Sequence, residues 1–223
     1  MQNTFSTVRS YVLRQGRFTK GQQAAFERHW PHYGVEPKPG LLDLRRLFGN
    51  SYPVVLDIGF GDGEALAQLG RQYPHLNFLG VEVYRPGVGS LLRKISESGL
   101  ENVRVMNMDV VIVLRKHIAP RSLAAVLIWF PDPWPKKRHH KRRLIQEGFV
   151  QSVADRLTSR GELSIATDWQ PYAEAIQQVM DRCTAFRKAG VSTLIRQRPH
   201  TKFERRGIRQ GHRVFAQVYC KTR

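Results

Sequence analysis

Short apolar segments alternate with helical patterns from residue 54 onward, and this alternation restricts the fold more than any other feature of the chain. Strands are expected at 54–58, 77–83, 103–109, 123–130, 162–167 and 213–220. Helices are expected at 64–73, 87–98, 110–118, 144–157 and 172–183. Apolar strands separated by helices of this length form βαβ units, in which helices cover both faces of a parallel sheet. The sequence therefore predicts an α/β fold with a doubly wound, mostly parallel sheet.

A glycine-rich turn, Asp57-Ile-Gly59-Phe-Gly61-Asp62-Gly, follows the first expected strand. Its glycines permit the tight backbone that lets a nucleotide-like ligand approach the main chain. A dinucleotide fingerprint needs glycine at position 64, where this chain has Glu64, and the carboxylates of the turn would repel a pyrophosphate. The sulfonium and ammonium groups of S-adenosylmethionine are cations, so this cofactor fits the turn better. A nicotinamide dehydrogenase is the least favoured enzyme class.

Two further carboxylates end the next two expected strands. Glu82 stands 19 residues after Gly63, where an acidic side chain can accept hydrogen bonds from both ribose hydroxyls. Asp109 ends the third strand, where it can reach an adenine amino group, although aspartate is also common as a helix N-cap. Together with Asp57 they place carboxylates at three successive strand ends, and this repetition favours a cofactor site over unrelated caps.

The fourth expected strand runs into an aromatic, proline-rich turn and a basic run, Phe130-Pro-Asp132-Pro-Trp-Pro-Lys136-Lys-Arg-His-His-Lys-Arg-Arg143. Asp132 is expected at the carboxyl end of the strand, where open α/β sheets bind ligands. A basic run alone is typical of a solvated surface. Joined to an aromatic, acidic turn, it indicates a planar, polyanionic substrate such as a base within a nucleic acid. The two histidines are adjacent and cannot share one helix face as ligands, so no metal site is predicted.

The formal net charge is +18, which indicates a polyanionic partner. Residues 54–130 hold eight Lys or Arg against seven Asp or Glu, whereas residues 131–223 hold twenty against eight. This uneven distribution predicts a nearly neutral ligand-binding core with basic flanks.

The domain interpretation follows from these flanks. Residues 1–40 are interpreted as a basic, mobile N-terminal arm, and residues 41–223 as a single domain with a basic RNA-binding loop at 136–143 and a basic segment at 196–213. The arm cations Arg9, Arg14, Arg17 and Lys20 either touch phosphate or only solvate a disordered tail.

Two cysteines, Cys183 and Cys220, make neither a disulfide framework nor a Cys-based zinc site, which is typical of a protein of the reducing cytoplasm. The chain shows neither the apolar core of a secretory signal nor an apolar stretch of 18 residues. No membrane partner is expected, and a monomer is expected rather than an obligate oligomer.

Five segments together resemble the bacterial tRNA (guanine-N7-)-methyltransferase family: Ile58-Gly-Phe-Gly, Leu79-Gly-Val-Glu-Val, Phe130-Pro-Asp-Pro-Trp-Pro-Lys, Ala166-Thr-Asp-Trp and Thr201-Lys-Phe-Glu. The resemblance runs from about residue 54 to about residue 219, and its third and fifth segments are far more specific than the glycine turn. It implies the class I methyltransferase fold, a Rossmann-like sheet of seven strands, with S-adenosylmethionine as methyl donor. It also implies that the acceptor is guanosine 46 in the variable loop of tRNA.

The resemblance assigns roles to individual positions. Those that match cofactor-binding positions are Asp57, Gly59, Gly61, Glu82, Asp109 and Asp132, and Asp132 also matches the catalytic position. Those that match substrate-binding positions are Lys136, Asp168, Thr201, Lys202, Phe203 and Glu204. The RNA-contacting run corresponds to Arg138, His139, His140, Lys141, Arg142 and Arg143. Asp57 departs from the family, in which Glu is usual, so its contact with the cofactor stays open although its charge is kept.

Guanine N7 exposes an in-plane lone pair and carries no proton, so its methylation requires alignment and no base. The product purine is cationic. Asp132 can therefore stabilise the developing charge or hold the guanine N1–H and amino edge, and Asp168 is a second candidate for reading that edge. Trp129, Trp134 and Trp169 either supply a stacking face or pack at the rim of the core.

Two alternative functions stay open. A class I methyltransferase acting on another RNA target, such as an exocyclic amine, would be expected to carry an Asn/Asp-Pro-Pro-aromatic turn, whereas this chain has Pro-Asp-Pro-Trp. A non-catalytic RNA-binding module with a decayed cofactor fold would have no need of the intact residues Gly59, Gly61, Gly63, Glu82 and Asp132.

Overall fold

The computed structural model describes residues 10–11, 18–209 and 211–222, and a seven-stranded sheet forms its centre. The strand order is β3-β2-β1-β4-β5-β7-β6. The strands are β1 (Val54–Ile58), β2 (Asn77–Val81), β3 (Val103–Met106), β4 (Leu123–Trp129), β5 (Leu157–Thr167), β6 (Phe186–Ala189) and β7 (Phe215–Lys221). Strands β1 to β5 pair in parallel, and β7 runs antiparallel to both β5 and β6. The predicted seven-stranded, mostly parallel sheet is confirmed.

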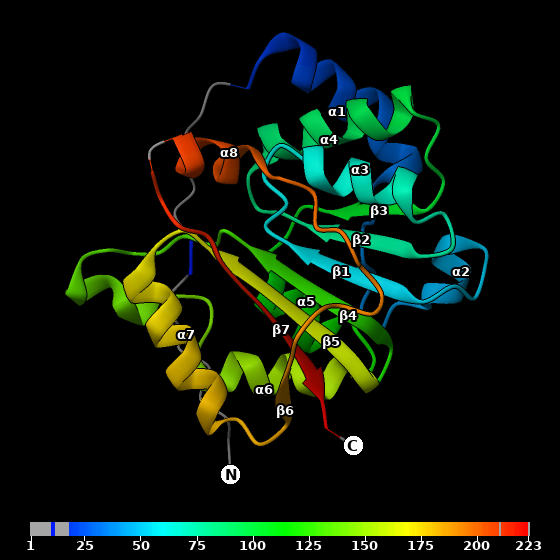
Figure 1. Cartoon of the computed structure of the whole chain (residues 1–223). Helices are drawn as coiled ribbons and strands as arrows, with labels where there is room; N and C mark the ends of the chain where they lie inside the picture. Colours follow the sequence, from blue (N-terminus) through cyan, green and yellow to red (C-terminus); the bar gives the residue numbers. More distant parts are fainter. Residues whose placement is uncertain (1–9, 12–17, 210, 223) are drawn as a thin grey trace.

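Helices cover both faces of this sheet (Figure 1). One face carries α1 (Lys20–Tyr33), α3 (Glu64–Gln72) and α4 (Arg85–Glu97), and the other carries α5 (Val110–Lys116), α6 (Glu147–Arg156) and α7 (Gln170–Arg182). Leu66 and Leu92 are fully buried in the first layer, as are Val113 and Tyr172 in the second. Burial of one large apolar side chain contributes roughly 1.5–3 kcal/mol, so the two layers together hold the sheet. Among the described residues, no helix has the length and apolarity needed to cross a membrane.

Helix α1 corrects the interpretation of residues 1–40 as a mobile arm. Thr19 and Gln22 form a capping box at its start, with Gln22 N donating to Thr19 Oγ1 at 3.2 Å and Thr19 N donating to Gln22 Oε1 at 3.1 Å. Phe26 is buried and stacks on Trp30 with ring centroids 4.8 Å apart. The helix therefore belongs to the folded unit. The arm cations Arg9, Arg14 and Arg17 lie outside the described residues.

Strands β2 and β3 end earlier than predicted, at Val81 and Met106. Glu82 and Asp109 consequently lie in the loops that follow, at the carboxyl edge of the sheet. This edge also carries the short 3-10 helix η1 (Lys137–Arg142) and helix α8 (Lys202–Arg209), both at the left of Figure 1. Neither of these elements, nor β6 or α2 (Leu44–Phe48), was among the expected segments.

Candidate active site

A cavity of about 410 Å³ opens at the carboxyl ends of the central strands. Five of the six predicted cofactor-binding residues line it: Gly59, Gly61, Glu82, Asp109 and Asp132. Its volume falls within the range of roughly 300–1,000 Å³ that is usual for small-molecule sites. Strand ends that are far apart in the chain thus bring their polar side chains to one pocket.

The glycine turn has a backbone conformation that residues with side chains rarely adopt. Gly59, Gly61 and Gly63 have φ of 73°, 62° and 74°, in the left-handed region that favours glycine. A Cβ atom on Gly63 would lie 2.4 Å from Cβ of Leu91, and one on Gly87 would lie 2.2 Å from the carbonyl oxygen of Gly61. The turn therefore packs directly against α4.

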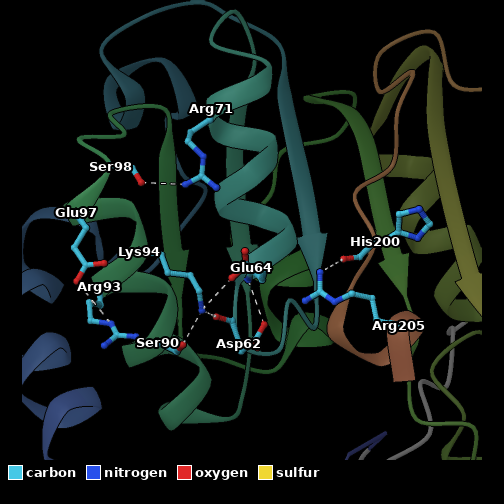
Figure 2. Close-up of polar contacts among 10 residues, drawn as sticks. All are labelled: Asp62, Glu64, Arg71, Ser90, Arg93, Lys94, Glu97, Ser98, His200 and Arg205. Carbon is cyan, nitrogen blue, oxygen red and sulfur yellow. Dashed lines mark hydrogen bonds and ion pairs between the residues drawn. The ribbon is translucent and has the colours of Figure 1, made fainter. Parts of the chain in front are cut away.

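Lys94 fastens this turn from the side of α4, as Figure 2 shows. Its Nζ donates to the carbonyl oxygen of Asp62 at 2.9 Å and to Ser90 Oγ at 3.0 Å, and it lies 3.7 Å from Glu64 Oε2. The Lys94 side chain is only about one-fifth exposed. The sequence reasoning missed Lys94 because it stands in an ordinary amphipathic helix, 32 positions after the carbonyl that it holds.

Glu82 is already oriented by the backbone around it. Its Oε1 accepts hydrogen bonds from Val83 N at 2.7 Å and Tyr84 N at 2.9 Å, and its Oε2 accepts one from Gly61 N at 3.0 Å. Burial raises the pKa of Glu82, while these backbone donors oppose the rise by stabilising the carboxylate. A carboxylate offers about four acceptor positions, so Oε2 keeps capacity for a ligand hydroxyl.

Asp109 combines the two roles considered for it. It is the N-cap of α5, and its Oδ1 accepts from Val111 N at 2.9 Å. The same side chain lines the cavity. The cap fixes the carboxylate and does not remove it from the site.

Asp57 does not line the cavity and is only 3% exposed. It borders a much smaller space of about 20 Å³, together with Trp129 and Thr201. Burial, and secondarily the neighbouring Glu82 carboxylate, raise the pKa of Asp57 to about 7. Two carboxyl groups thus lie close together at the glycine turn, and a cationic ligand bound beside them would favour their ionised forms.

Asp132 lies in a strained turn at the rim of the cavity. Phe130 and Trp134, two residues to either side, have φ of 56° and 46°, and such values in non-glycine residues cost about 1–3 kcal/mol each. Phe130 N donates to the carbonyl oxygen of Ala166 at 2.7 Å, which ties the turn to β5. Asp132 itself is exposed and lines the cavity. The turn thus presents a solvated carboxylate at the edge of the cavity that Glu82 and Asp109 also line.

The predicted substrate-binding residues divide into separate environments. Thr201 accepts a hydrogen bond from Glu204 N at 3.1 Å at the start of α8 and reaches the small space beside Asp57. Asp168 lies under α8, with its Oδ2 3.3 Å from His212 Nδ1, and does not line the 410 Å³ cavity. Lys136 is exposed. The side chains of Lys202 and Phe203 are not among those described, so their roles stay predictions.

Glu204 corrects the expectation of direct substrate contact. It is 3% exposed, and its carboxylate accepts two hydrogen bonds from Arg198, at 2.7 and 2.5 Å. Burial favours the neutral acid, but the Arg198 guanidinium outweighs it and lowers the pKa of Glu204. The pair holds Arg198 over the rings of Trp129 and Phe130, 5.7 Å from each centroid. Glu204 thus supports Arg198, a residue that the sequence reasoning placed only within a generally basic segment.

The residues of the basic run differ in their exposure to solvent. Arg138 and Lys141 are exposed. His139 packs edge-on against Trp134 with ring centroids 5.6 Å apart, and Arg142 lies 5.1 Å above the same ring. Arg143 is only 7% exposed, and its Nε donates to the carbonyl oxygen of Pro133 at 2.9 Å. The predicted RNA contact of Arg143 is therefore corrected, because its guanidinium faces the turn that carries Asp132.

The three tryptophans proposed as stacking faces have different surroundings. Trp129 is buried and donates from Nε1 to Ser164 Oγ at 3.0 Å. Trp134 is partly buried and donates to the carbonyl oxygen of Ser10 at 3.1 Å. Only Trp169, at 36% exposure, presents a large open surface among the three.

Known proteins are similar to this chain in sequence and in fold. A family model described as "Putative methyltransferase" matches residues 51–217. The tRNA (guanine-N(7)-)-methyltransferase of Pseudoalteromonas translucida is 46% identical over 221 residues, covering 97% of this chain and 92% of the relative. The protein of the same name from Halorhodospira halophila is 49% identical over 217 residues, covering 95% and 94%.

Solved methyltransferase structures resemble the fold. The 16S rRNA methyltransferase KamB aligns with a TM-score of 0.60 at 14% identity, covering 86% of this chain and 99% of that one. A SAM-dependent methyltransferase from Aquifex aeolicus aligns with a TM-score of 0.52 at 13% identity, covering 81% and 88%. At these identities the likeness establishes a shared fold.

Proposed function

The chain belongs to the tRNA (guanine-N(7)-)-methyltransferase family, and we propose that it methylates N7 of the guanosine at position 46 in the variable loop of tRNA. It is an S-adenosylmethionine-dependent methyltransferase of the class I fold. One observation carries the residue-level proposal: Asp132 lines the same cavity as Glu82 and Asp109. The carboxylate proposed to face the purine therefore stands beside those proposed to hold the methyl donor.

The donor set of the cavity fits S-adenosylmethionine. Glu82 would hold the ribose hydroxyls through Oε2, and Asp109 would accept from the adenine amino group. Asp57 and Glu82 place negative charge below a ligand whose methionine end carries the cations. Bound in this cavity, S-adenosylmethionine supplies an electrophilic methyl group.

The protein's contribution to the reaction is alignment and charge. Guanine N7 needs no deprotonation, so Asp132 acts as an electrostatic and orienting group and not as a base. Asp168 and Thr201 are proposed to contact the guanine or its nucleotide from the side of α8. Lys136, Arg138, Lys141 and Arg142 are proposed to hold the phosphates of the tRNA, with His139 and His140 at the same surface.

We propose that the protein acts in the cytoplasm and that its active form is a monomer. Cys183 and Cys220 are free, as suits a reducing compartment. The cavity residues named above all come from this chain, which supports a site formed within one subunit. Among the described residues, no cluster of His, Cys, Asp and Glu side chains could hold a metal ion, and the proposed chemistry uses none.

The proposed function is tested by incubating the protein with methyl-labelled S-adenosylmethionine and unmodified tRNA, followed by mapping of the label. Label is expected at N7 of guanosine 46, and a tRNA with adenosine at that position should accept none. Label on an exocyclic amine would establish the alternative methyltransferase. Binding of tRNA without any transfer would establish the non-catalytic RNA-binding module.

Cofactor affinity should increase with pH between 6 and 8, by up to about tenfold. With a pKa of about 7, Asp57 is mostly protonated at pH 6 and mostly ionised at pH 8. A cationic ligand favours the ionised form, so binding lowers this pKa and releases a proton. Calorimetry in two buffers of different ionisation enthalpy measures that release. Asp57→Asn should flatten the pH dependence, and an identical slope in this variant would remove Asp57 from the cofactor's field.

The variant Arg138→Ala/Lys141→Ala should weaken tRNA binding and flatten its salt dependence by about one to two counterions, since both side chains are exposed on η1. Cofactor affinity should stay the same, because phosphate contacts position the RNA and do not touch the cavity. The matched control, Arg187→Ala/Lys188→Ala, removes the same charge from exposed positions on β6. Equal losses of tRNA affinity in the two variants would show that tRNA binding depends only on the net charge of the protein.

A further inference from the structure

The turn that carries Asp132 needs external support. Phe130 and Trp134 both adopt positive φ, and non-glycine residues keep such conformations only where surrounding contacts fix them. On the amino-terminal side, Phe130 N donates to Ala166 on β5. The carboxyl-terminal side runs into η1, on the exposed surface of the protein. The carbonyl of Pro133, which directly follows Asp132, is a backbone acceptor through which a partner can fix this side of the turn.

Arg143 is that partner. Its Nε donates to the Pro133 carbonyl oxygen at 2.9 Å, and its Nη2 lies 3.1 Å from His140 Nε2. A guanidinium has no acceptor, so in a hydrogen bond between these two groups Arg143 Nη2 donates and His140 Nε2 accepts. The Arg143 guanidinium thus joins the turn that carries Asp132 to the last turn of η1.

The Tyr172 ring packs against this guanidinium. The Arg143 guanidinium carbon lies 4.8 Å from the centre of the Tyr172 ring, which is fully buried at the start of α7. The Tyr172 hydroxyl accepts from Ile145 N at 3.2 Å, just beyond Arg143. Gln146 Nε2 donates to the Arg143 carbonyl oxygen at 2.8 Å. Both the side chain and the backbone of Arg143 are consequently fixed against the core.

We propose that Arg143 is a positioning residue for methyl transfer, which holds Asp132 in place through the Pro133 carbonyl. This rests on the catalytic role proposed for Asp132. It separates the basic run by function: the exposed cations of η1 bind phosphate, and the last arginine transmits the position of η1 to the turn. Binding of tRNA to η1 and alignment of Asp132 are thereby mechanically connected.

Arginine-to-lysine replacement distinguishes this role from a phosphate contact. Lysine keeps the positive charge, which is sufficient for a phosphate, but it lacks the planar fork that reaches Pro133 and His140 while stacking on Tyr172. Arg143→Lys should therefore reduce the single-turnover rate of methyl transfer at saturating tRNA and cofactor by about ten- to a hundredfold, as expected for a misaligned catalytic group. The dissociation constants of tRNA and cofactor should change by less than about threefold, and the salt slope of tRNA binding should not change.

Three further measurements make the result decisive. Arg182→Lys applies the same substitution to an exposed arginine at the end of α7 and should leave rate and affinity unchanged. Thermal unfolding reports whether Arg143→Lys is folded. Should it not fold, His140→Ala, which removes the acceptor that faces Nη2, should still lower the saturating rate by severalfold. Either variant retaining the wild-type rate while folded, or losing tRNA affinity and salt slope instead of rate, overturns the proposal. An inactive wild-type protein would refute the proposed function and not the role of Arg143.

Discussion

Asp132→Asn should lower the rate of methyl transfer at saturating tRNA and cofactor by at least about a hundredfold. Loss of one group that stabilises developing charge typically costs a factor of about 100 to 1,000. Asp132 is exposed at the rim of the cavity, so removal of its charge should change the free energy of unfolding by less than about 0.5 kcal/mol. The large effect on rate and the small effect on stability together identify a catalytic group.

The two roles considered for Asp132 differ in their effect on tRNA affinity. If the carboxylate stabilises the positive charge that develops on the purine, the rate falls while the tRNA dissociation constant stays the same. If it holds the guanine N1–H and amino edge, the rate falls and the tRNA dissociation constant rises. Single-turnover kinetics and filter binding separate the two, with Asp155→Asn on the exposed face of α6 as the matched control. Near-normal turnover of Asp132→Asn would refute either role.

The sequence predicted the central sheet well because its signals are local. Strand β1 was expected at the residues where it is found, and the antiparallel β7 was expected within two residues of its start. Continuous apolar runs and glycines at strand ends carry this information without reference to distant residues. Carboxylates that follow such runs necessarily meet at one edge, so Glu82, Asp109 and Asp132 were placed correctly around one cavity.

Sequence reasoning failed where the role of a residue depends on its tertiary partner. Arg143 looks the same in the sequence as Arg142, yet one lies against Tyr172 in the core and the other lies over Trp134 at the surface. Glu204 stands in a family motif, and only the fold reveals that Arg198 occupies its carboxylate. Helix α1 was different, because the Thr19 and Gln22 capping box was present in the sequence and was overlooked within a polar, basic segment.

Glu82→Ala should weaken cofactor binding by about ten- to a hundredfold. Hydrogen bonds to a charged acceptor contribute roughly 1.5–3 kcal/mol, and Oε2 is the atom proposed to receive the ribose. The substitution also deprives the backbone N–H groups of Gly61, Val83 and Tyr84 of their acceptor. Because Gly61 belongs to the turn that lines the cavity, the loss should fall toward the upper end of this range.

A second variant separates these two contributions. Glu82→Gln keeps one oxygen that can accept from the backbone, but its amide nitrogen would face either Gly61 N or the donors at Val83 and Tyr84. Its affinity should therefore lie between those of the wild type and Glu82→Ala, as measured by calorimetry. Glu97→Ala, an exposed carboxylate on α4 outside the cavity, is the matched control. Wild-type affinity in both Glu82 variants would mean that the carboxylate only shapes the loop and that the ribose is held elsewhere, with Asp109 as the remaining carboxylate of the adenosine side.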